Sequence, residues 1–196
     1  VNGTNDRPSI TAIDVTGSVT EDTALTSVVS ATDLTDSGSI TFSDLDTSDL
    51  STAAVVLRSA AYSNSSVGLG STVTNGLTAA MQLSGAGAAS PANNGTLHWQ
   101  FALNNSLVQF LAAGETITAT YTITVTDDSG VSATASRSQD VTVTINGTND
   151  VPVITNAVTA LVGAVTEAGS NDDGSSVGGS PSVSGTLSAS DVDTGA

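Results

Sequence analysis

The sequence predicts an all-β fold, an antiparallel β-sandwich, on three observations. Val, Ile and Thr recur in alternating runs, which is typical of half-buried strands. Turn signals interrupt these runs often, and no amphipathic helix is long enough to build βαβ units. We count about seven or eight strands between Pro8 and Asn146, as expected for a β-sandwich. Aromatic residues make up only 3% of the chain, so Val, Ile, Leu and Ala must supply most of the buried apolar surface.

The first third of the chain is predicted to alternate strands and turns. Residues 8–19 begin in an extended segment, because a proline disfavours helical geometry in the residue before it. Residues 25–32 are predicted to form a strand. Asp36-Ser37-Gly38 is a turn signal, and residues 39–43 alternate as a strand. Residues 53–62 form a further predicted strand.

The middle of the chain combines irregular and regular segments. The region from Asn64 to Asn94 is rich in Gly, Ser, Ala and Asn, and we expect loops there with one or two short strands. GTLHWQFAL, residues 95–103, alternates as a strand. Residues 106–113 are predicted to form one or two helical turns that end at Gly114. The face of 95–103 that should point into the core comprises Leu97, Trp99, Phe101 and Leu103.

The clearest strand of the sequence is TITATYTITVTD, residues 116–127. One of its faces is predicted to be buried and the other carries threonines. Asp127-Asp128-Ser129-Gly130 then predicts a hairpin turn, and residues 131–137 and 140–145 complete the meander. The predicted buried face comprises Ile117, Ala119, Tyr121, Ile123 and Val125.

Three segments of the sequence recur at a nearly fixed spacing. VNGTNDRPSI (1–10) returns within VTVTINGTNDVPVI (141–154), so that Gly3 and Gly147 lie 144 residues apart (147 − 3). Residues 17–22 return less well as 163–168, and 38–47 return as 185–194, 147 residues on (185 − 38). Such a period predicts tandem modules. Residues 1–8 would end a preceding repeat, 9–147 form a complete one, 148–152 a linker, and 153–196 the first strands of an incomplete next one.

The charge of the chain is strongly negative. Nineteen acidic and three basic residues give a formal net charge of −16, which disfavours nucleic acid and anionic membrane surfaces as partners. So many carboxylates either stay solvated or need cations such as Ca²⁺. There is no cysteine, and no apolar run reaches the roughly 20 residues of a membrane span, so we predict no membrane insertion. The chain starts inside a motif and shows no signal peptide, which predicts a window from something longer.

The acidic residues cluster at predicted strand ends and turns. An Asp-x-Asp pair places two carboxylates on one side of an extended chain, where they could supply oxygens to Ca²⁺. The alternatives are a solvated strand end for Asp44-Leu45-Asp46, a plain turn for residues 127–130, and an Asx turn for Asn-Asp-x-Pro. The segment after Asp44 is not an EF-hand, because Asp49 stands where the glycine belongs and Val55 where the bidentate glutamate belongs.

Nothing in the sequence predicts an enzyme. His98 is the only histidine and should face solvent if Trp99 faces the core. There is no Gly-x-Ser-x-Gly elbow. Paired carboxylates could hydrolyse glycosides, but such clefts usually offer aromatic platforms, and this chain has one Trp and two Tyr.

Residues 95–154 resemble the VCBS-type repeat of giant bacterial RTX adhesins and related surface proteins, which is akin to cadherin-like domains. The resemblance rests on Leu-Ala-Ala-Gly-Glu, Val-Thr-Asp and Asn-Gly-Thr-Asn-Asp-x-Pro in this order. Residues 38–47 and 185–194 are similar to the family's Gly-x-Leu-x-x-x-Asp-x-Asp segment. The resemblance implies an Ig-like or cadherin-like sandwich used in tandem outside a Gram-negative cell, with Ca²⁺ stiffening the junctions of a cell-surface adhesin or filament.

Carried over to this chain, the resemblance implies two metal sites with neighbouring repeats as partners. Which of Asp127 and Asp128 is the ligand stays open. The region from Asn64 to Asn94 departs from shorter family members, and an adhesive module that binds glycans or a cell surface through it is the alternative function. A fibre in which a neighbouring chain or module completes residues 151–196 is a further hypothesis. The implied ligands are Glu21, Asp127 or Asp128, Asn149, Asp150, Asp191 and Asp193 at one junction, and Asp6, Asp44 and Asp46 one module earlier.

Overall fold

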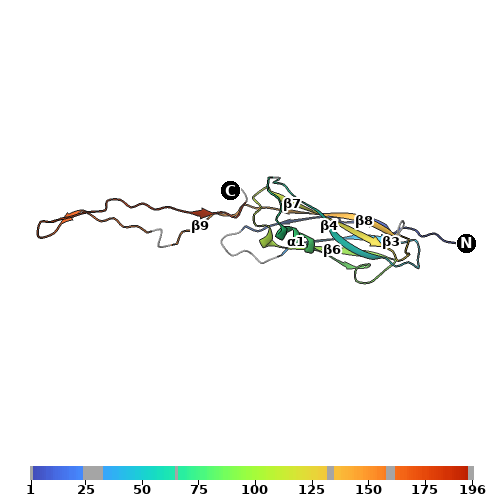
Figure 1. Cartoon of the computed structure of the whole chain (residues 1–196). Helices are drawn as coiled ribbons and strands as arrows, with labels where there is room; N and C mark the ends of the chain where they lie inside the picture. The colour runs from blue at the N-terminus through green and yellow to red at the C-terminus, as the bar shows by residue number, and fades with distance from the viewer. Residues whose placement is uncertain (1, 24–32, 65, 132–134, 158–161, 194–196) are drawn as a thin grey trace. The chain divides into compact units, whose positions relative to one another are not determined.

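The computed structural model describes residues 2–23, 33–64, 66–131, 135–157 and 162–193. The chain divides into two compact units (Figure 1). The first comprises residues 1–150 with 193–196, and the second comprises residues 151–192. The predicted strand over residues 25–32 lies outside the described residues. The described part is mostly β, which confirms the predicted all-β fold.

The first unit is a sandwich of two four-stranded sheets. One sheet has the order β1-β3-β6-β5 and the other β2-β8-β7-β4. The elements are β1 (Ser9–Ala12), β2 (Thr16–Thr20), β3 (Asp33–Ser43), β4 (Thr52–Tyr62), α1 (Ser71–Ala80), β5 (Met81–Gly85), β6 (Asn94–Asn104), the 3₁₀ turn η1 (Asn105–Leu107), β7 (Thr116–Thr126) and β8 (Ser136–Asn146).

One pair of strands departs from the antiparallel arrangement that the sandwich otherwise shows. β2 runs parallel to β8, from Thr16 opposite Thr142 to Thr20 opposite Asn146. The other described pairs are antiparallel, and β7 and β8 pair along their whole length. A parallel pair needs a long crossover between its strands, and here most of the sandwich separates β2 from β8 in the sequence.

The core lies between the two sheets, and the alternation in β6 and β7 predicts it correctly. Every residue of the two predicted inward faces is at most 2% exposed. Val141, Val143 and Ile145 of β8 add to the same core, and Ile40 and Phe42 of β3 face them from the other sheet. A side-chain period of two therefore places the large apolar residues of these inward strand faces in one layer. His98 is exposed, as predicted.

Residues 71–80 form a helix, whereas the sequence predicts loops and short strands there. Val73, Leu77 and Ala80 of α1 are buried at helical spacing. The backbone oxygen of Leu77 accepts a hydrogen bond of 2.7 Å from the Tyr121 hydroxyl, which anchors α1 to β7. Three Thr and Gly76 give this segment a weak helix propensity. Burial of one face, rather than propensity, therefore stabilises α1.

Two further local predictions are corrected. Asp36-Ser37-Gly38 is no turn but the centre of β3, and Gly38 pairs with Trp99 of β6. A Cβ on Gly38 would lie 2.5 Å from Trp99 Cζ2, so the glycine gives room to the indole. Residues 136–146 form one strand, β8, so the predicted break between residues 137 and 140 does not occur, and residues 132–134 lie outside the described residues.

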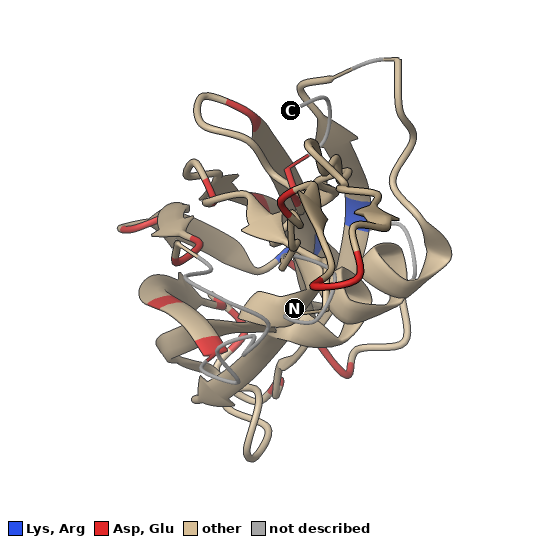
Figure 2. Cartoon of the chain, turned by 90° about the vertical axis from the view of Figure 1, so that its left-hand side faces the viewer, with Lys and Arg blue, Asp and Glu red and all other residues tan. Residues whose placement is uncertain are grey.

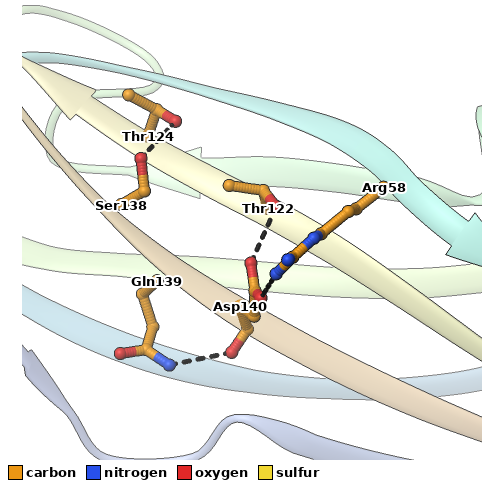
Figure 3. Close-up of polar contacts among 6 residues, drawn as sticks. All are labelled: Arg58, Thr122, Thr124, Ser138, Gln139 and Asp140. Carbon is orange, nitrogen blue, oxygen red and sulfur yellow. Dashed lines mark hydrogen bonds and ion pairs between the residues drawn. The ribbon is translucent and has the colours of Figure 1, made fainter.

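The outer face of the β4–β7–β8 sheet is polar (Figure 3). Arg58 of the edge strand β4 forms an ion pair with Asp140 of β8, across β7. Asp140 Oδ1 also accepts a hydrogen bond of 2.7 Å from the Thr122 hydroxyl. A β-bulge lies between Leu57 and Ser59. The charge and the bulge both discourage another strand from adding to this edge.

Glu115 ties the segment before β7 to the end of β4. Tyr62 Oη donates to Glu115 Oε2 at 2.5 Å, Asn64 Nδ2 donates to Oε1 at 3.0 Å, and the Ala112 amide donates to Oε2 at 3.2 Å. These hydrogen bonds, the one from Tyr62 first, lower the pKa of the Glu115 carboxyl despite its partial burial.

We expect Glu115→Gln to lower the free energy of unfolding near neutral pH by about 1 kcal/mol. Because the pKa of Glu115 is lower in the folded than in the unfolded state, its contribution is full above the unfolded value of about 4.3. It is lost as the pH falls through the folded value. Urea unfolding of both proteins near neutral pH and at low pH checks this, and the difference should shrink in acid. An equal difference at both pH values would contradict the expectation.

The second unit contains two short strand pairs. β9 (Val153–Ile154) pairs with β12 (Ala189–Ser190), and β10 (Gly169–Ser170) pairs with β11 (Ser176–Val177). The large apolar residues of its described part are exposed, among them Val162, Val183 and Leu187. Within the described residues of both units, no helix is long and apolar enough to cross a membrane.

Candidate functional site

Two clusters of carboxylates lie in the first unit, at the ends of strands. The first carboxylate cluster comprises Asp44, Asp46, Asp49 and Asp127. Asp44 follows β3 and Asp127 follows β7, and their relative exposures are only 7% and 6%. Buried carboxylates are uncommon unless something compensates their charge. Figure 2 shows the acidic segments of the chain mainly in loops and strand ends, with few basic positions to compensate them.

Hydrogen bonds fix the first carboxylate cluster to the N-terminal segment. The Asp6 amide donates to Asp46 Oδ2 at 2.7 Å, and Asn5 Nδ2 donates to Asp127 Oδ2 at 3.4 Å. Asp44 Oδ1 accepts from the Asp46 amide at 3.0 Å. Asp44 Oδ2 is also buried, and the described residues offer it no hydrogen-bond partner. An unsatisfied buried carboxylate oxygen of this kind suits a cation.

Ionisation of all the carboxyl groups of the first cluster is unfavourable without a cation. Burial raises the pKa of Asp44, and the charges of Asp127, Asp46 and Asp49 add to this effect. Burial also works against the ionisation of Asp127. Hydrogen bonds from Ser129 and Asn5 outweigh it, so the pKa of Asp127 lies below its usual value. Like charges therefore crowd around one point, where a cation would relieve their repulsion.

The structure separates the two neighbouring acids Asp127 and Asp128. Asp127 lies in the cluster, whereas Asp128 Oδ1 accepts a hydrogen bond of 3.0 Å from the Leu50 amide and Asp128 is exposed. Asp127 is thus the better candidate ligand, and Asp128 stabilises the loop before β4.

The second carboxylate cluster comprises Glu21, Asp150 and Asp193, with relative exposures of 2%, 1% and 7%. It lies at the other end of the sandwich, where β2 and β8 end. Asp127 therefore does not join Glu21 at one junction, as the resemblance implies, but lies with Asp44 in the first cluster. β7 spans eleven residues between the two ends, which corresponds to a separation of about 35 Å.

Hydrogen bonds hold both oxygens of Glu21. Oε1 accepts from the Thr148 amide at 2.7 Å and from the Thr148 hydroxyl at 2.8 Å, and Oε2 accepts from Gln109 Nε2 at 2.5 Å. Burial raises the pKa of Glu21, the Thr148 hydrogen bonds oppose this, and the charges of Asp150 and Asp193 add to it. The carboxylate is therefore oriented before any ligand arrives.

The same backbone hydrogen bond occurs in both clusters. The Asp150 amide donates to Asp193 Oδ2 at 3.0 Å, as the Asp6 amide does to Asp46 Oδ2. Asp150 is 144 residues after Asp6, and Asp193 is 147 residues after Asp46 (150 − 6; 193 − 46), which are the offsets of the sequence repeat. The repeated sequence thus builds the same local geometry twice.

Two further sequence-predicted residues, besides Asp128, do not belong to either cluster as defined above. Asn149 is exposed, and its Nδ2 donates to the Asp150 carbonyl oxygen at 2.6 Å. Asp191 is half-buried and belongs to the second unit. Conversely, sequence reasoning missed Gln109 and Thr148. Gln109 interrupts the apolar run LVQFL, and such a polar residue in a buried segment signals that it has a specific partner.

The carboxylates of both clusters offer only oxygen atoms as metal ligands, which fits calcium or magnesium rather than a soft metal. Within the described residues, no three carboxylate or histidine side chains are arranged to hold a metal ion by themselves. A cation at either cluster would also need backbone, amide or water oxygens, which calcium accepts in a shell of about six to eight.

The region from Asn64 to Asn94, predicted as loops and as an alternative binding site, contains α1 and β5. Leu77 and Met81 of these elements enter the core, so the region closes one side of the sandwich. A surface hollow of about 540 Å³ lies beside it, lined among others by Arg58, Tyr62 and Thr74. Binding through this region stays a prediction.

Comparison of the chain with protein-family models and with curated proteins finds no match. The VCBS-type resemblance therefore remains a prediction from the motifs themselves.

Proposed function

We propose that this chain is a structural tandem-repeat module of an extracellular bacterial adhesin or surface filament, stiffened by Ca²⁺ at the junctions between repeats. The observation that carries the proposal is the pair of buried carboxylate clusters at opposite ends of one sandwich, with the same Asp–Asp hydrogen bond in each. A module that meets its neighbours at both ends needs such sites at both ends.

In this proposal, Asp44, Asp46 and Asp127 hold one cation, with Asn5 and Asp6 on the linker side. Glu21, Asp150 and Asp193 hold the other. Bound calcium supplies positive charge that cancels the repulsion among these carboxylates. Residues of the linker and of the sandwich then share one cation, so that the linker is fixed to the end of the sheet.

We expect millimolar calcium to raise the melting temperature of the chain strongly and a chelator to reverse this. A cation at about 100 times its dissociation constant adds about 2.7 kcal/mol per site. Differential scanning calorimetry in chelator and in calcium measures the effect. Sodium chloride at equal ionic strength is the control, because general screening would also relieve repulsion among surface charges.

Small-angle scattering of the same samples tests whether calcium stiffens the chain. The mean span of the chain should become longer and less variable with calcium. An unchanged melting temperature and span at millimolar calcium would overturn the proposal.

A further inference from the structure

Residues 151–192 repeat the first sandwich in strand register as well as in sequence. The repeat offsets of 144 and 147 convert two of the four β1–β3 partner pairs into the two β9–β12 pairs. In β1–β3, Ile10 lies opposite Phe42 and Ser9 opposite Ser43; in β9–β12, Ile154 lies opposite Ala189 and Val153 opposite Ser190. A slip of one residue would have turned the side chains to the other face. β9 and β12 are therefore the counterparts of β1 and β3.

In the first unit, β3 has β6 as its second neighbour, and the indole of Trp99 lies over two glycines. A Cβ on Gly38 would lie 2.5 Å from Trp99 Cζ2, and a Cβ on Gly17 would lie 3.2 Å from Trp99 Cη2. The indole Nε1 donates to the Asp14 carbonyl oxygen at 2.8 Å. Trp99 is fully buried, so the absence of both side chains is a condition for its position.

Both glycines recur in the second unit. Gly163 is the counterpart of Gly17, and Gly185 is the counterpart of Gly38. The contact between the strands recurs too. A Cβ on Gly17 would meet Asp36, and a Cβ on Gly163 would meet Val183, which is the counterpart of Asp36.

The residues around Gly163 and Gly185 enclose a hollow of about 360 Å³, with Val162 and Leu187 in its lining. Leu187 is 69% exposed, whereas its counterpart Ile40 in the first unit is fully buried in the core, with Leu97 of β6 as its strand partner. The hollow thus has the apolar wall and the two glycines that the indole of Trp99 uses in the first unit, but its wall is open to solvent.

We propose that residues 151–192 dock an antiparallel strand with the sequence pattern of β6, whose indole sits on Gly163 and Gly185. The β3–β6 register fixes the alignment. The tryptophan lies opposite Gly185, and the leucine two residues before it lies opposite Leu187, as Leu97 lies opposite Ile40. The occupant is a strand of a second module of this same repeat type. The inference rests on the glycines and the register and needs no calcium.

The test appends a second copy of residues 50–150 to the full chain after Ala196, the counterpart of Asp49. Acrylamide quenching then reports how accessible the two tryptophans are. We expect both indoles to be protected. Gly185→Val should expose one of them, whereas Gly178→Val should expose neither, because a Cβ on Gly178 meets nothing within 4 Å.

The measurement is made in calcium and in chelator. If only the calcium proposal fails, both indoles stay protected in both conditions. One indole freely quenched in both conditions would overturn the inference. So would equal quenching in Gly185→Val and Gly178→Val. Hydrogen exchange gives a second readout, since amides of residues 183–186, which lie before the part of the chain that pairs with β9, should become protected only when the second copy is present.

Discussion

Replacement of Trp99 by alanine is expected to lower the free energy of unfolding of the first unit by about 3–5 kcal/mol. The indole is fully buried between the sheets, and its Nε1 hydrogen bond to the Asp14 carbonyl oxygen links β6 to the chain before β2. A domain of this size has a total stability of about 5–15 kcal/mol, so the loss is a large part of the whole. Urea unfolding followed by far-UV circular dichroism measures it, because Trp99 is the only tryptophan.

Two further variants separate the contributions to this loss. Trp99→Phe keeps an aromatic ring but removes the hydrogen bond, and should lose less than the alanine variant. Gly38→Val leaves the indole in the chain but places side-chain atoms where it lies, so it should also be strongly destabilising. If Gly38→Val were as stable as the original chain, the close packing of β3 on Trp99 would be refuted.

The large strands could be predicted because their side chains follow a simple period. Apolar and polar residues alternate throughout β7 and from Leu97 to Phe101 in β6, so the fold class and the buried face follow from one rule. α1 could not be predicted in this way, since its residues have low helix propensity and its stability comes from contacts of Val73 and Leu77 with the core.

Gly38 shows a second limit of local reasoning. Asp-Ser-Gly is a good turn signal, but here a glycine is needed because the indole of Trp99 leaves no room for a side chain. Trp99 is 61 residues away in the sequence (99 − 38). In the candidate site, too, some features follow from the local sequence and others depend on distant contacts. The acids could be found because they repeat at strand ends, whereas the hydrogen bonds from Gln109 and Thr148 to Glu21 depend on packing between distant segments.

Asp44→Asn is expected to change the stability of the chain in opposite directions with and without calcium. In chelator, the variant should be more stable than the original chain by about 1–2 kcal/mol. The substitution keeps Oδ1 as the acceptor for the Asp46 amide, and it removes a buried charge that faces Asp46, Asp49 and Asp127. In calcium, the variant lacks one carboxylate of the proposed site, so it should gain less stability and rank below the original chain.

Asp140→Asn is the matched control, because Asp140 pairs with Arg58 on the outer face of the sheet and belongs to neither cluster. Its effect should be small and the same in chelator and in calcium. Thermal unfolding of the three proteins across a calcium titration gives the comparison. If Asp44→Asn lowered stability equally in both conditions, Asp44 would be only the residue that caps the turn after β3. A reversal of the ranking requires that the buried carboxylate destabilise the chain by itself and stabilise it with a cation, which a turn-capping residue cannot do.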